Sequence, residues 1–172
     1  MIGLVFGAIT ATAGGAYAAG YRVNVSDSLP PGVWQVRPGP VQRGSIVLIC
    51  PPNTSLFQGA RRAKYIARGA CPGGMAPLLK PVAAVAGDRI AVSAAGIRVN
   101  GSPVPNTARF GVDGSGRFLP SAQDGERVVP AGQIWLLSSY NKYSFDSRYF
   151  GPLAASRVSG VARPVYLQER RS

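Results

Sequence analysis

Short apolar runs separated by turn-forming residues are the dominant pattern along this chain. Residues 32–37 (GVWQVR) and 45–50 (SIVLIC) are strand-like and are separated by a Pro-Gly-Pro turn. Residues 76–104 predict three strands with a Gly-Asp turn and a Gly turn between them, followed by an Asn-Gly hairpin. Residues 133–139 predict a further strand, and residues 161–167 one that closes the sheet. The pattern therefore predicts a mainly β fold.

The segments between these runs are predicted to be loops. Residues 51–75 are dense in Pro, Gly and Arg, and residues 140–152 are polar and aromatic. Residues of about 105–126 are Gly-rich and polar, which is typical of a surface insertion. The pattern contains no long amphipathic helix and no internal repeat. A length of 172 residues fits one domain with a small insert.

The first twenty residues are apolar and uncharged, and they predict a separate N-terminal helix. As a helix, residues 1–20 would be about 30 Å long, which matches the core of a bilayer. They also contain Ala16-Tyr17-Ala18, the small-x-small form of a signal-peptide cleavage site. The segment is therefore a retained membrane anchor, a removed signal peptide or a buried soluble helix. We favour the anchor, which divides the chain into an anchor at 1–20 and a domain at 21–172.

Both the anchor and the signal peptide place the domain outside the cytoplasm. With the anchor the protein lies in the inner membrane with a periplasmic domain, and with a removed signal peptide it is periplasmic. Two cysteines, Cys50 and Cys71, agree with this compartment, because an even pair in an exported domain predicts a disulfide. The alternative is two unpaired cysteines, one at a strand end and one in a loop.

The chain is strongly basic, with 19 Lys and Arg against 7 Asp and Glu and a net charge of +12. Such a balance fits nucleic acid or an anionic membrane as a partner. The arginines are scattered, however, and form neither a stripe nor an arginine-rich helix. We therefore interpret the charge as a basic solvated surface and expect no specific nucleic-acid partner.

The chain contains no histidine, which restricts its chemistry. Ser-His-Asp and Cys-His catalysis are excluded. Two cysteines without a histidine disfavour a zinc site, so we expect no metal and no cofactor. A serine nucleophile would have to be activated by lysine instead.

Lys80 is the lysine best placed for that role. It lies in an apolar run between Leu79 and Pro81, whereas Lys64 and Lys142 lie in polar segments. Burial lowers the pKa of a lysine because desolvation disfavours the ammonium, and a neutral amine is what a general base requires. The alternative is a solvent-facing side chain on an edge strand, which the neighbouring proline would suit.

Ser28 is the candidate nucleophile, because it precedes Leu-Pro-Pro-Gly. Two prolines and a glycine can build a rigid turn that directs a hydroxyl and a backbone N–H toward one point. Such an arrangement serves a nucleophile and an oxyanion donor. Ser26 could add a second donor from its side chain. The alternative is an ordinary turn that follows the N-terminal helix.

Four segments occur in the order found in bacterial type I signal peptidases: SDSLPPGVW, LLKPVAAVAGDRI, IRVNGSPV and SFDSRYFGP. The sequence most closely resembles the TraF-like conjugative-transfer peptidases, which carry a Ser-x-Pro-x-Gly-aromatic nucleophile segment. Here Val33 stands between Gly32 and the aromatic Trp34. The resemblance covers nearly the whole chain from about residue 21. It implies a signal peptidase-like antiparallel β-fold with a β-barrel-like catalytic core.

The resemblance also implies roles for individual residues. Ser28 would be the nucleophile, Lys80 the general base, and the Ser26 hydroxyl an oxyanion donor. Ser144 would orient the lysine amine, and Asp146 would pair with Arg148 or support the site.

The implied substrate is a membrane-inserted, pilin-like precursor for conjugation or type IV secretion. The product is either linear or, after attack by its own amino terminus, cyclic. The main competing hypothesis is a general type I signal peptidase that removes signal peptides from exported proteins. Two further hypotheses are a non-enzymatic membrane-anchored assembly factor and a basic nucleic-acid-binding module.

Overall fold

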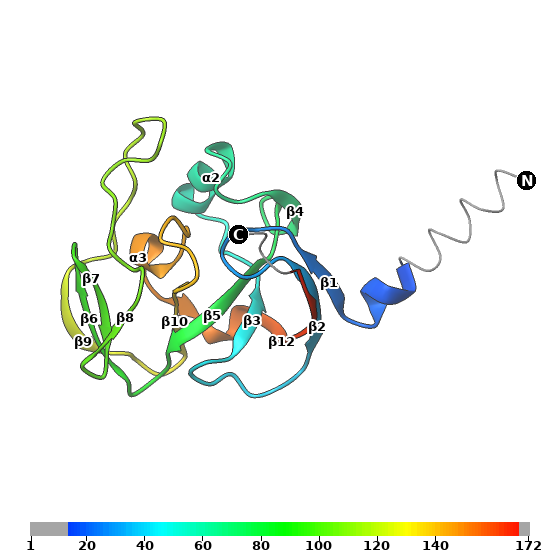
Figure 1. Cartoon of the computed structure of the whole chain (residues 1–172). Coiled ribbons are helices and arrows are strands. Elements are labelled where there is room, and N and C mark those ends of the chain that lie inside the picture. Colours follow the sequence, from blue (N-terminus) through cyan, green and yellow to red (C-terminus); the bar gives the residue numbers. More distant parts are fainter. Residues whose placement is uncertain (1–13, 169–172) are drawn as a thin grey trace, which may run out of the picture.

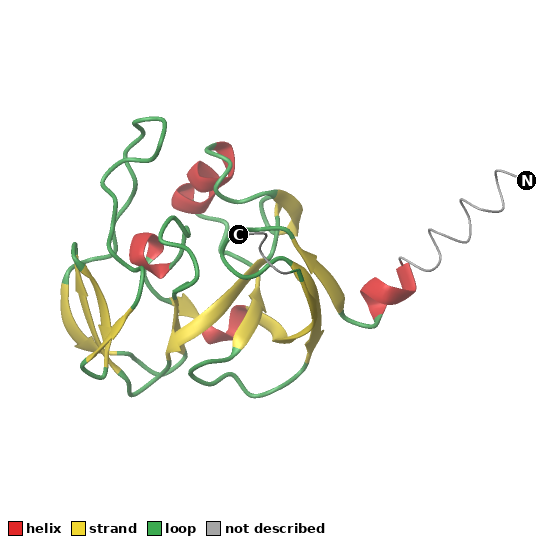
Figure 2. Cartoon of the chain, viewed as in Figure 1, coloured by secondary structure: helices red, strands yellow, loops and turns green. Residues whose placement is uncertain are grey.

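The computed structural model describes residues 14–168, and within them the strands form two antiparallel sheets (Figures 1 and 2). The larger sheet has seven strands, in the order β1 (Tyr21–Asn24), β2 (Gly32–Arg37), β12 (Val158–Leu167), β3 (Ile46–Ile49), β5 (Leu78–Ala84), β10 (Gln133–Leu136) and β11 (Leu153–Ala154). The smaller sheet has the order β8 (Ser102–Val104), β7 (Gly96–Val99), β6 (Arg89–Ser93) and β9 (Gly125–Val128). The predicted mainly β fold is confirmed.

Most strands lie where the apolar runs predict them. Strand β2 has the predicted bounds, and β3 lies inside the predicted run of 45–50. The 76–104 segment forms β5 to β8, and Asn100 and Gly101 have positive φ angles of 49° and 82°, as the Asn-Gly hairpin requires. The last strand, β12, begins at Val158 and pairs with both β2 and β3, so it closes the sheet as predicted.

The core follows the alternation of strand side chains. In β6, Ile90 and Val92 are buried, whereas Arg89 and Ser93 are exposed, because successive residues point to opposite faces. The small sheet packs its apolar face against Trp135 of β10, Leu137 just after it and Ala84 of β5. The two sheets thus meet at β10, next to the segment that carries Ser144.

The prediction that residues 51–75 form only a loop is wrong. Helix α2 (Ser55–Arg62) lies there, and it buries Phe57 and Ala60 in the main core. Eight residues with an internal glycine are too few for helical periodicity to stand out in the sequence. Strand β4 (Arg68–Cys71) follows the helix.

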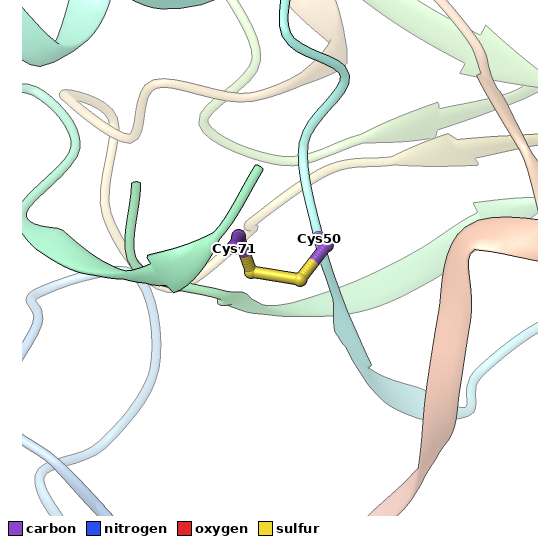
Figure 3. Close-up of a disulfide and its surroundings, with 2 residues drawn as sticks. All are labelled: Cys50 and Cys71. Atoms are coloured by element: carbon purple, nitrogen blue, oxygen red, sulfur yellow. A yellow bond between two sulfur atoms is a disulfide. The ribbon is translucent and has the colours of Figure 1, made fainter. Parts of the chain in front are cut away.

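A disulfide joins Cys50 to Cys71, as the cysteine count predicts (Figure 3). It connects the residue after β3 to the end of β4, with Cα atoms 5.5 Å apart. The disulfide therefore holds the segment that contains α2 and β4, residues 51–71, against the main sheet.

The 105–126 insertion is mainly an exposed loop, and it extends beside α2 at one end of the molecule (Figure 1). Its two ends are not free, because Thr107 and Ala122 are buried, and its last residues enter β9. The 140–152 segment is also more than a loop, since it contains the short helix α3 (Ser147–Phe150) and is largely buried.

The N-terminal prediction falls mainly outside the described residues. Residues 14–18 are helical and stand off the edge of the sheet beside β1 (Figure 1), whereas residues 1–13 lie outside the described part. Between residues 14 and 168, no helix has the length and apolar character needed to cross a bilayer.

Candidate active site

Ser28 lies in the turn between β1 and β2, and buried contacts hold this turn in shape. The Asn24 side-chain amide donates hydrogen bonds of 3.1 Å to the carbonyls of Ser26, Leu29 and Pro30. Leu29 is buried in a small cluster with Trp34. The residues around Ser28 therefore have a fixed backbone, as the Pro-Pro-Gly sequence predicts.

Gly32 allows this turn to enter β2 against β12. Its φ angle is +153°, and a Cβ atom there would lie 2.1 Å from the carbonyl oxygen of Tyr166. A side chain at this position would collide with backbone, so the close approach of the two strands requires glycine.

Lys80 reaches Ser28 from β5, where it pairs with Val47 of β3. Its residue surface is 4% exposed, so the alternative of a solvent-facing lysine is excluded. The amine contacts Ser28 Oγ and donates to Ser144 Oγ at 2.7 Å. The Ser144 hydroxyl in turn lies 3.2 Å from Ser28 Oγ. Three side chains from distant parts of the sequence thus meet at one nitrogen.

Burial lowers the pKa of Lys80 to about 8, from an ordinary value of 10.5. The carboxylate of Asp146 opposes this fall and the guanidinium of Arg148 assists it, so desolvation remains the main cause. At pH 7 about a tenth of the molecules then carry a neutral amine at this position. The site can therefore supply a general base near neutral pH.

Asp146 and Arg148 form a fully buried ion pair beneath this cluster. Arg148 Nε donates to Asp146 Oδ1 at 2.8 Å, and both side chains have 0% exposure. The guanidinium also donates to the carbonyls of Asn106, Ser138 and Lys142. The pair thus fixes the segment that carries Ser144, and Asp146 does not itself touch the lysine amine.

Ser138 is a member of the site that was not predicted from the sequence. Its hydroxyl donates to the carbonyl of Ser28 at 2.6 Å, and its backbone N–H donates to Asp146 Oδ2 at 3.0 Å. It therefore joins the turn that carries Ser28 to the buried ion pair. Sequence spacing holds no signal for it, because Ser28 and Ser138 are 110 residues apart.

Ser26 lies two residues before Ser28 and lines a cleft that opens beside it. Its hydroxyl donates to Asn24 Oδ1 at 2.7 Å, and its backbone N–H donates to the same oxygen at 3.1 Å. To serve as an oxyanion donor, the hydroxyl would rotate from Asn24 toward the cleft. Asn24 is a buried polar residue of this site that the sequence does not mark, because a strand of four residues is too short for alternation to distinguish it.

A mainly apolar cleft of about 300 Å³ opens beside Ser28 and Lys80. It is lined by the segment around β1, by the start of β5, and by Tyr65, Ile66 and Ala67. A serine hydroxyl held against a buried amine, next to such a cleft, defines a candidate serine peptidase that operates without histidine.

Comparison with known proteins gives the class. The chain belongs to the family described as signal peptidase, peptidase S26, whose sequence profile matches residues 2–167. Family membership supports a serine peptidase of the signal-peptidase type.

Three relatives have names that refer to plasmid transfer or conjugal transfer. The chain is 41% identical to a plasmid transfer protein TraF from Escherichia coli, over 92% of this chain and 90% of that protein. It is 42% identical to a probable conjugal transfer protein TraF from Sinorhizobium fredii, over 92% and 83% of the two chains. It is 43% identical to a conjugal transfer protein TraF from Agrobacterium fabrum, over 86% of this chain and 82% of that protein.

A crystal structure of a signal peptidase I from Enterococcus faecalis is a remote structural neighbour. It has a TM-score of 0.40 and 17% identity, and the match covers 73% of this chain and 98% of that one.

Proposed function

We propose that this protein is a serine endopeptidase that processes a membrane-inserted, pilin-like precursor for conjugative transfer. Ser28 is the nucleophile and Lys80 the general base. The observation that carries the proposal is the buried Lys80 amine, which contacts the Ser28 and Ser144 hydroxyls together. The names of the relatives, all transfer proteins, support a role in conjugation.

In the proposed mechanism, the neutral amine of Lys80 takes the proton of Ser28 as Oγ attacks the scissile carbonyl. The Ser28 N–H and the Ser26 hydroxyl stabilise the oxyanion. The ammonium then gives its proton to the departing amine, and an acyl-enzyme on Ser28 remains. Ser144 holds the lysine amine in line throughout, because it accepts a hydrogen bond from the same nitrogen.

An edge strand beside the cleft supports an extended polypeptide as the substrate. Within residues 14–168, β1 is an edge strand that pairs only with β2, and the same strand lines the cleft. An extended chain can add to such an edge as a further strand.

The proposal includes the membrane as a partner. Residues 1–20 anchor the protein in the inner membrane, and the domain from about residue 21 is periplasmic. The Cys50–Cys71 disulfide supports an oxidising compartment. Because β1 follows the proposed anchor directly, the nucleophile would lie where a membrane-inserted precursor emerges.

The acyl-enzyme can be resolved in two ways. Water gives a linear product, whereas the amino terminus of the same substrate gives a cyclic one. The two products differ by the mass of one water, so intact mass distinguishes them.

The test is co-expression of a pilin precursor with the wild type, Ser28→Ala or Lys80→Met, followed by intact-mass analysis of the precursor. We expect the wild type to shorten it and both variants to leave it whole. Lys142→Met is the matched control and should process normally, because the Lys142 side chain lies over Tyr143 and only its backbone carbonyl, which the substitution keeps, contacts Arg148. Normal processing by Lys80→Met would refute the proposed dyad.

A second substrate separates the general signal peptidase from the dedicated one. Unrelated presecretory proteins should remain uncut by the wild type under conditions in which the pilin precursor is processed. Efficient cleavage of these proteins would instead assign the protein a general role.

A further inference from the structure

The 105–126 insertion is anchored to the active-site segment at both of its ends. Arg148 donates to the carbonyl of Asn106 at 2.6 Å, and its own carbonyl accepts from the N–H of Ala122 at 3.0 Å. The side chain of Asn106 also donates to the carbonyl of Ser139 at 2.7 Å. The loop therefore leaves from, and returns to, the buried ion pair of the site.

Hydrogen bonds and an ion pair hold the middle of the insertion against Tyr65 of the cleft wall. The Tyr65 hydroxyl donates to Asp113 Oδ2 at 2.5 Å, and Asp113 also accepts from the backbone N–H groups of Ser115 and Arg117. The side chain of Arg117 pairs with the same carboxylate and lies over the Tyr65 ring. The insertion is thus held beside Tyr65, which also lines the cleft.

A second groove lies between this fastened insertion and helix α2, with a volume of about 530 Å³. Leu56, Ala60 and Ala63 line its α2 side. From the insertion, Phe118 and Pro120 line the opposite side, and Phe118 is 91% exposed. An exposed phenylalanine at the rim of an apolar groove is a feature of binding surfaces.

The groove shares a wall with the catalytic cleft. Tyr65 and Phe145 line both cavities, and their rings are stacked with centroids 5.2 Å apart. Phe145 directly follows Ser144, which contacts Lys80. The aromatic pair of Tyr65 and Phe145 is therefore a wall that the cleft and the groove have in common.

We propose that the α2–insertion groove binds a second, apolar segment of the same substrate polypeptide, next in sequence to the segment held in the cleft. The proposal rests on the peptidase function proposed above. The wall that the two cavities share, Tyr65 and Phe145, identifies the occupant, because a chain that passes over this aromatic pair as it leaves the cleft enters the groove. The groove takes apolar side chains, since its lining is mainly Leu, Ala, Pro and aromatic residues.

Phe118→Ala tests this site with little risk to folding, because the side chain is almost fully exposed. Loss of an aromatic anchor at a binding surface costs about 1–2 kcal/mol, or roughly a tenfold rise in KM. Phe110→Ala is the matched control. It removes the same side chain from the same insertion, but Phe110 stacks on Tyr143 and does not line the groove.

The substrates are synthetic peptides based on the cleavage site mapped in the co-expression test. A short peptide covers only that site. Two longer peptides add about ten residues, one before the site and the other after it, and ten residues in a β conformation span about 30 Å. We expect one longer peptide to have a KM about tenfold below that of the short peptide. Phe118→Ala should abolish that advantage and leave the short peptide unaffected, with kcat unchanged throughout.

The proposal fails if neither extension lowers KM, or if Phe118→Ala and Phe110→Ala have the same effect on all peptides. These outcomes are distinguishable from failure of the peptidase function, because the short peptide reports the chemistry at Ser28 independently. If the wild type cleaves the short peptide and the extensions make no difference, the dyad stands and the groove has no part in substrate binding.

Discussion

Replacement of Lys80 by methionine is expected to abolish peptidase activity and to stabilise the fold near neutral pH. Methionine has a similar length and is apolar, so it fills the space of the lysine without a charge. The wild type must either bury an ammonium or lose a proton there. Methionine does neither, and the difference is measurable as a free energy of unfolding.

The size of the effect follows from the pKa of Lys80. A fall from 10.5 in the unfolded chain to about 8 in the fold, at about 1.4 kcal/mol per pH unit, destabilises the wild type by about 3 kcal/mol at pH 7. Between these two pKa values the unfolded chain binds more protons than the folded one, so the wild type gains stability as the pH rises. At pH 10 the remaining penalty is about 1 kcal/mol.

The assay is urea unfolding of the wild type and Lys80→Met at pH 7 and pH 10. We expect the stability of the variant relative to the wild type to decrease by about 2 kcal/mol from pH 7 to pH 10. Hydrogen bonds lost at Ser28 and Ser144 shift the difference at both pH values alike, so the change with pH isolates the lysine. Lys142→Met is the control and should show no such change. A difference independent of pH would refute a buried lysine with a lowered pKa.

Three further predictions concern pH, the ion pair and the turn. Below pH 8, kcat/KM should rise about tenfold per pH unit and then level off, as steady-state rates between pH 6 and 10 would show, because only neutral Lys80 can accept a proton. Arg148→Met should destabilise the fold by about 3–5 kcal/mol in urea unfolding, since it leaves the buried Asp146 carboxylate unpaired; no loss would contradict the pairing. Gly32→Ala should lower stability by at least about 1 kcal/mol in thermal unfolding, because its Cβ meets the Tyr166 carbonyl, whereas Gly114→Ala, with open space around it, should not.

Most of the longer strands were predictable because they depend on local alternation of apolar and polar residues, whereas the short strands β1, β4, β9 and β11 were not predicted. Strand β2 and the hairpins after β5 carry their own turn chemistry, so their bounds follow from neighbouring residues alone. Helix α2 escaped prediction because it is short, contains Gly59, and owes its burial to contacts of Phe57 and Ala60 with the distant core. Tertiary packing, rather than helical propensity, accounts for it.

The residues of the candidate site also divide into those that the local sequence indicates and those that depend on the fold. Ser28 and Lys80 could be singled out from sequence, since one precedes a proline-rich turn and the other interrupts an apolar run. Asn24 and Ser138 could not, because neither has a sequence pattern that marks it. Asn24 acts through hydrogen bonds within the turn that carries Ser28, and Ser138 acts through one hydrogen bond to Ser28, 110 residues away. Arg148 appears in the sequence only as a partner for Asp146, whereas in the fold it also holds both ends of the insertion.

The sequence by itself determined the mainly β class, the need for a base other than histidine, and the identity of the residues that could supply it. All of these depend on residue types and on spacings of a few positions. Only the tertiary structure decided that Lys80 is buried and that its amine meets Ser28 and Ser144, which are 52 and 64 residues away. The physical reason is that desolvation and hydrogen-bond geometry depend on atoms brought together by chain folding, and these have no local pattern in the sequence.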